Sequence, residues 1–137
     1  MEQSSAQLKK YAGNLVLNVN NDILELQKIY ARIKDGDFSQ LTDSDRAKEK
    51  KIEENKILLE NTVSKLDSMK EYVQEEKLEK ILKMMKTTIQ STNTVFDQKA
   101  NINISAVNIV KEMKDEAETF ITDIEISEKK WFPTYLF

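Results

Sequence analysis

The chain has no cysteine and no histidine. Without cysteine it forms no disulfide and no thiolate metal site. Without histidine it lacks the side chain that most often serves as a general acid or base near neutral pH. These absences argue against an enzyme, so we expect no catalytic residue, no metal site and no cofactor.

Glycine and proline are also scarce, with two and one respectively. A sheet protein needs many tight turns, and tight turns rely on these residues. The stretch from Asp37 to Phe132 contains neither. We therefore predict an all-α fold, an elongated antiparallel bundle of three to four long helices with coiled-coil-like packing. The bundle should occupy residues 1–130, with an aromatic C-terminal tail at residues 131–137.

The chain has no surplus of positive charge and no long hydrophobic run. Its 24 acidic residues outnumber 21 basic ones, so binding to a nucleic-acid backbone lacks its usual electrostatic source. The N-terminal "MEQSSAQLKK" has no signal-peptide pattern, and no stretch approaches a membrane span. We expect an acidic, cytoplasmic protein with no nucleic-acid partner, while export without a cleaved signal stays open.

The hydrophobic residues that are present recur with helical periodicity. Steps of three and four from Leu8 to Ile33 predict a first helix from about Ser5 to Lys34. The following "KDGDFSQLTDSD" indicates a loop, with Gly36 ending the first helix. This aspartate-rich loop lacks the glycine and glutamate at the positions where an EF-hand needs them, so we do not expect calcium binding.

A second helix is predicted from near Ser44, capped by residue 42 or 43, with a heptad seam of Ile52, Leu59, Leu66 and Val73. After the seam the register changes around "QEEK". This favours a turn or kink into a third helix, although one continuous helix with a local defect is the alternative.

The segment "QSTNTVFDQKANINIS" is rich in residues that favour helix caps, so it predicts another break. A last helix should run from about Asn101 to Lys129. Its apolar steps repeat those of the first helix, which predicts that the first and last helices pack side by side. Its many carboxylates lie mostly off this apolar face and indicate a solvated surface.

A second stripe on the first helix is the first candidate interface. It combines Leu17 and Leu24 with small residues such as Gly13, in a stretch that nearly lacks charge. One interpretation is that the first helix is central and contacts neighbours on two sides within one monomer. The other is that Leu17 and Leu24 bind a partner.

The tail "SEKKWFPTYLF" is the second candidate interface. Pro133 should stop the last helix near Lys130. The tail then caps its own bundle, docks on a partner, or anchors the protein at a membrane surface. The candidate partner-binding residues of the tail are Trp131, Phe132, Tyr135 and Phe137.

These features together predict a non-enzymatic protein–protein interaction protein. It would be a helical subunit of a larger complex, or a helical adaptor or chaperone. The partner, another protein or a second copy, would bind through apolar helix faces and the aromatic tail. The alternative is a peripheral membrane-surface protein that uses the tail, although a membrane partner is the less favoured reading.

Overall fold

The structure, a computed structural model, describes residues 5–71 and 75–131. These residues form four α-helices and two short 3-10 helices, with no strand among them. The α-helices are α1 (Ser5–Ala31), α2 (Asp43–Lys70), α3 (Glu76–Gln98) and α4 (Ile104–Trp131), and the 3-10 helices are η1 (Phe38–Gln40) and η2 (Lys99–Asn101). The predicted all-α bundle is confirmed.

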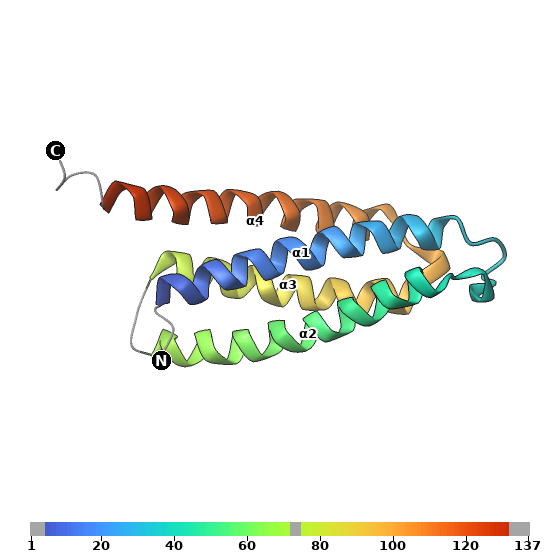
Figure 1. Cartoon of the computed structure of the whole chain (residues 1–137), viewed down its shortest axis with the longest axis horizontal. Coiled ribbons are helices and arrows are strands. Elements are labelled where there is room, and N and C mark those ends of the chain that lie inside the picture. Colours follow the sequence, from blue (N-terminus) through green and yellow to red (C-terminus); the bar gives the residue numbers. More distant parts are fainter. Residues whose placement is uncertain (1–4, 72–74, 132–137) are drawn as a thin grey trace.

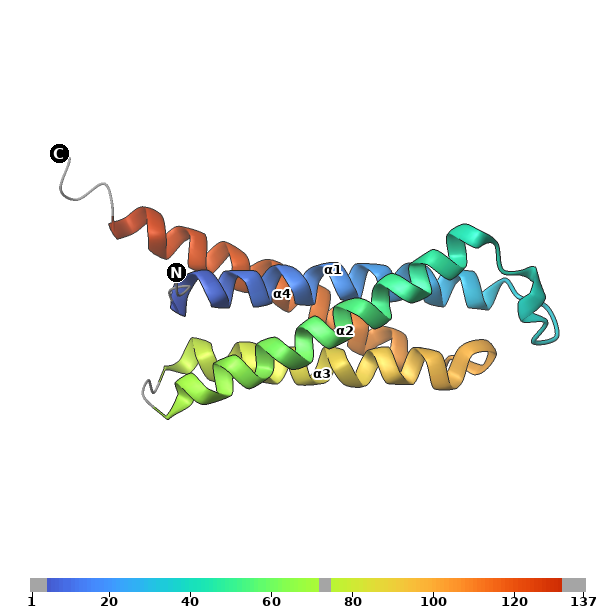
Figure 2. The same cartoon turned by 60° about the horizontal axis from the view of Figure 1, so that its bottom comes forward.

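Consecutive helices run antiparallel along the length of the bundle (Figure 1). Helices α1 and α3 contact each other, and each of them also contacts α2 and α4. Over the described ranges, α2 and α4 do not touch each other. The most extensive contact joins α1 to α4, which confirms that the first and last helices lie side by side. Helix α4 runs obliquely, from beside the end of α3 to beside the start of α1 (Figure 2).

The first two helix boundaries follow local capping. Helix α1 ends at Ala31, earlier than the expected Lys34, and Asp35 and Gly36 both adopt positive φ angles of 56° and 67°. Helix α2 begins after Thr42, whose hydroxyl accepts a hydrogen bond from the Asp45 amide in a capping box. Of the two predicted N-cap positions, 42 and 43, it is therefore Thr42 that caps the helix.

The later boundaries confirm one expectation and correct another. Helix α2 ends at Lys70 and α3 starts at Glu76, so the favoured break is confirmed and the alternative of one continuous helix is wrong. Helix α4 starts at Ile104 rather than near Asn101. The reason is that the Asn103 side chain accepts a hydrogen bond from the Ala106 amide at 2.8 Å and thereby caps the helix. Helix α4 extends to Trp131, beyond the expected Lys129.

The core forms where the apolar seams of the helices converge. Ile52, Leu59 and Leu66, the described members of the predicted heptad seam, are fully buried. They pack in one cluster with the seam of α1 and with apolar residues of α3 and α4. Burial of these seams supplies most of the driving force for folding.

Helix α1 approaches α4 closely at Gly13. A Cβ atom at this position would lie 3.1 Å from Ile121 Cγ1 and 3.1 Å from Phe120 Cδ1. Such distances are tighter than ordinary van der Waals contact, so a side chain at this position would force its neighbours on α4 to shift. The small residue in the second stripe of α1 is therefore explained by packing within one monomer.

We predict that Gly13→Val lowers the free energy of unfolding by about 1–3 kcal/mol, because its side chain overpacks the contact with Phe120. Ala6→Val is the matched control, since Ala6 is exposed on the same helix and should change stability by less than about 0.5 kcal/mol. Urea unfolding followed by circular dichroism measures both. A Gly13→Val protein as stable as the parent chain would contradict this packing.

Candidate functional site

The predicted interface residues of α1 lie at the edge of the core. Leu17 and Leu24 are half-buried and pack against the hydrophobic cluster of their own chain. They do not form a free apolar stripe. Their part in partner binding stays a prediction, and any partner would cover only the part of each side chain that the chain's own core leaves exposed.

The predicted tail lies almost wholly outside the described residues. Trp131 is the last residue of α4. The other three candidates, Phe132, Tyr135 and Phe137, lie beyond the described part of the chain. Partner binding by the tail also stays a prediction.

A different set of apolar side chains is exposed in the structure. Three of the large hydrophobic residues that are exposed belong to α4, and Ile104 is the most open of them at 76%. Ile109, also on α4, is 42% exposed. The complete set in the described residues is Tyr11, Ile57, Leu58, Ile104, Ile109 and Ile126.

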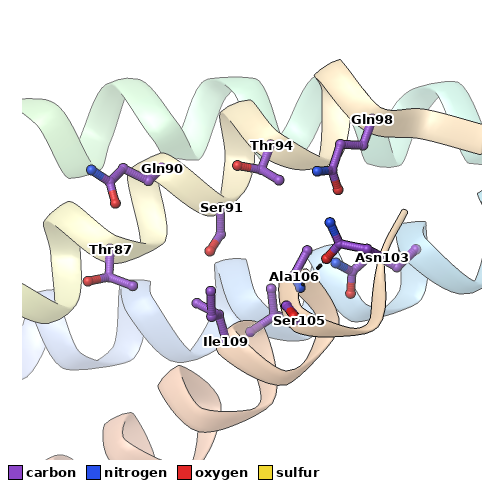
Figure 3. A pocket seen from close by; sticks show the side chains of 11 residues that line it. Thr87, Gln90, Ser91, Thr94, Gln98, Asn103, Ser105, Ala106 and Ile109 are labelled. Carbon is purple, nitrogen blue, oxygen red and sulfur yellow. Dashed lines mark hydrogen bonds between the residues drawn. The ribbon is translucent and has the colours of Figure 1, made fainter. Parts of the chain in front are cut away.

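Ile109 is exposed because α3 and α4 do not close on each other at this level. A cleft of about 280 Å³ lies between the C-terminal half of α3 and the beginning of α4, and Gln27 of α1 also lines it. Figure 3 shows the side chains that form its walls. The lining residues are Gln27, Thr87, Gln90, Ser91, Thr94, Gln98, Asn103, Ser105, Ala106, Ile109 and Val110.

None of these lining residues is ionisable, in a chain of which 33% is charged. Helix α3 contributes amides and hydroxyls at helical spacing. Ser91 and Gln98 extend from it toward the first turns of α4 (Figure 3). The opposite wall adds Asn103 and Ser105, with Ile109 beside them. The cleft is therefore polar but electrically neutral.

Two of the lining residues carry a buried amide oxygen that has no hydrogen-bond partner. They are Oε1 of Gln27 and Oε1 of Gln98. Gln27 is only 6% exposed, so its oxygen is withdrawn from bulk solvent. A buried acceptor without a donor costs about 1–3 kcal/mol.

A second polar layer lies deeper, between α1 and α3. Asn20 is fully buried, and its Nδ2 donates to the Val16 carbonyl at 2.7 Å and to Thr88 Oγ1 at 3.0 Å. The Thr88 hydroxyl donates in turn to the Met84 carbonyl at 2.8 Å. Oδ1 of Asn20 is left without a partner. Buried uncharged amides thus follow one another along α1 toward the cleft.

Charged groups interact elsewhere on the bundle. Buried Lys9 forms an ion pair with Glu75 at 2.6 Å, which ties α1 to the start of α3. Tyr30 donates a hydrogen bond to Glu49, and burial, helped by this bond, raises the pKa of Tyr30 above its ordinary value. Tyr30 therefore remains a protonated donor throughout the physiological range. These contacts join helices and do not line the cleft.

Residues 5–71 and 75–131 hold no group of three or more side chains that could bind a metal ion. Within the same ranges, no helix combines the length and the apolar character that crossing a membrane requires.

No family model, no curated protein and no solved structure matches the chain.

We predict that Asn20→Leu raises the free energy of unfolding by about 1 kcal/mol. The substitution removes a buried, unpartnered oxygen. The Val16 carbonyl and Thr88 Oγ1 each lose the Asn20 donor, but Val16 stays within helix α1 and the Thr88 hydroxyl still donates to Met84, so neither is left unsatisfied. Asn18→Leu is the control because Asn18 is exposed on the same helix. Urea unfolding measures both variants. A loss of more than about 1 kcal/mol in Asn20→Leu would mean that the two Nδ2 hydrogen bonds outweigh the cost of the oxygen.

Proposed function

We propose that this chain is a non-enzymatic helical protein that works by binding another protein, as a subunit of a larger complex or as an adaptor or chaperone. The observation that carries the proposal is the neutral cleft with partly exposed isoleucine beside it. Ile109 both lines the cleft and is 42% exposed. Uncharged polar groups next to exposed aliphatic groups are typical of the centre of a protein–protein interface, where charged residues are depleted.

The energetics favour a local anchor rather than a complete interface. Full burial of one isoleucine side chain contributes about 1.5–3 kcal/mol. Association costs at least several kcal/mol in lost freedom. Ile104 and Ile109 could therefore provide a hot spot, but further contact area is needed. The tail predicted from the sequence is the proposed source of that area.

Other partner classes have less support from the described residues. The cleft has no basic lining residue, and the net charge of the chain is −3, so a nucleic-acid backbone finds little attraction there. A membrane-surface role depends on the tail alone. The protein partner is either a second copy of this chain or a different protein, and the mass of a crosslinked product distinguishes the two.

A photo-crosslinking amino acid placed at Ser105 tests the proposal in cells that produce the protein. Ser105 is exposed and lines the cleft, whereas Ser64 is exposed on α2 and serves as the control position. We expect a discrete crosslinked protein from position 105 and none from position 64. A product of twice 15.9 kDa would identify a second copy. Absence of any protein product at position 105 would contradict the proposal.

Two matched substitutions locate the contact. Ile109→Asp should reduce the crosslink yield at least about tenfold, because a buried charge at the interface costs more than 1.4 kcal/mol. Leu58→Asp is the control, since Leu58 is 41% exposed on α2 and Ile109 is 42% exposed on α4. Truncation after Lys130 should weaken capture further if the tail adds contact area. An equal loss in Leu58→Asp would place the interface elsewhere.

A further inference from the structure

The solvent-facing side of α1 carries a regular row of polar side chains. Helix α1 runs between α2 and α4 (Figure 1), and these two helices and α3 contact it. The side that they leave open has residues in steps of three, four, three, four and three, which is the heptad spacing of a helix that packs lengthwise on another helix. This outer row consists of Tyr11, Asn14, Asn18, Asn21, Glu25 and Lys28, of which Asn21 is half-buried and the others are exposed.

The central part of the outer row is free of exposed charge. Between Lys10 and Glu25 the one charged residue is Asp22, whose side chain is 15% exposed and pairs with Lys51 of α2 at 3.5 Å. Charged residues make up 33% of the chain, and they normally cover the solvated face of a helix. An uncharged row with heptad spacing therefore points to another helix as its neighbour.

The central amides of the outer row suit the same amides of a second copy. In an antiparallel helix pair, alternate members of a heptad row meet across the contact, so Asn18 can face Asn21 of the second copy. A carboxamide both donates and accepts hydrogen bonds, and a like amide is therefore a matching partner. Two-fold symmetry repeats the pair, because Asn21 then faces Asn18 of the second copy.

The same register brings unlike groups together at both ends of the outer row. It places Asn14 opposite Glu25 of the second copy, where the amide can donate to the carboxylate. The Glu25 side chain is 57% exposed, and a hydrogen bond from Lys48 lowers the pKa of its carboxyl, so the acceptor is ionised at neutral pH. The next pair joins Tyr11, 39% exposed, to Lys28, whose ammonium can lie on the phenol ring. A parallel pair would instead set Glu25 against Glu25 and Lys28 against Lys28, which is repulsive.

Two leucines that border the outer row add apolar surface. Leu17 and Leu24 are half-buried, and each directly precedes a member of the row. The antiparallel register puts Leu17 beside Leu24 of the second copy, so both lose their remaining contact with water, which is favourable. The row is about 26 Å long and about 10 Å wide. Since a stable interface covers roughly 800 Å² on each partner, the contact should be weak and concentration-dependent.

We infer that the outer row binds the outer row of a second copy in an antiparallel, two-fold dimer. This inference goes beyond the proposed function, because no member of the outer row lines the cleft. The two surfaces therefore act independently of each other.

Disulfide crosslinking tests the register, because the chain has no cysteine of its own. Asn18→Cys and Asn21→Cys chains, one of them isotope-labelled, are mixed under mild oxidation. The dimer should bring these two positions within disulfide reach, so the mixed product should exceed its statistical proportion over the products of one variant. Asn61→Cys and Ser64→Cys, exposed on α2 with the same spacing, are the control pair and should crosslink at least about tenfold more slowly, because no dimer holds them together.

Sedimentation equilibrium measures the dimer without a crosslink. The mass of the parent chain should rise from 15.9 kDa toward twice that value as its concentration approaches about 1 mM. The double variant Asn18→Asp/Asn21→Asp keeps the side-chain shape, removes the central donors and adds four like charges to the contact, so it should dimerise at least about tenfold more weakly. Asn61→Asp/Asn93→Asp adds the same charge at exposed positions of α2 and α3 and should dimerise like the parent chain.

A parent chain that stays monomeric over this range would overturn the inference, and the outer row would then be a solvated surface. It would also be overturned by an excess of disulfide products of one variant, or by equal weakening in both double variants. These results leave the crosslink from position 105 unaffected. Conversely, a dimer through α1 without any crosslinked protein from position 105 would refute the partner at the cleft and retain the contact between outer rows.

Discussion

Helix α1 must pack against the three other helices at once, and the rest of the structure depends on this constraint. A helix enclosed on so many sides cannot carry inward-facing charges without partners. Three uncharged residues accordingly follow one another on α1 at intervals of two turns. Gly13 admits α4 at close range, Asn20 bonds to α3, and Gln27 reaches the cleft. The packing thus changes along α1 from close contact to an open, neutral site.

The cleft is a consequence of how α4 is attached. Helix α4 crosses the bundle obliquely, from beside the end of α3 to beside the start of α1 (Figure 2), and the cleft lies between its first turns and α3. Ile109 is exposed at this cleft, where every lining residue is uncharged. Exposed apolar surface lowers its free energy when a partner covers it, and uncharged polar groups cost less to cover than charged ones. This combination is the physical basis of the proposed protein binding.

Periodicity alone was sufficient to predict the helices, because the apolar seams are long and nearly regular. It placed helix ends less well, since caps such as Asn103 depend on single side-chain hydrogen bonds. The cleft was not predicted, because its lining comes from three separate segments. The predicted break occurs within its segment, after Gln98, but Ser91 and Thr92, which also favoured a break, are helical and buried. Gly13 of the second stripe packs against α4 of the same chain, which agrees with the interpretation that the first helix contacts neighbours on two sides within one monomer.

Native-state hydrogen exchange tests the central position of α1 most directly, because it reports the opening free energy of each backbone amide. The slowest amides should lie in α1 between Leu15 and Leu26, and they should exchange only through global unfolding. Amides in the first turns of α4, from Val107 to Val110, should exchange through local opening beside the cleft. Equal protection of these turns and of α1, or slowest exchange in another helix, would contradict the account.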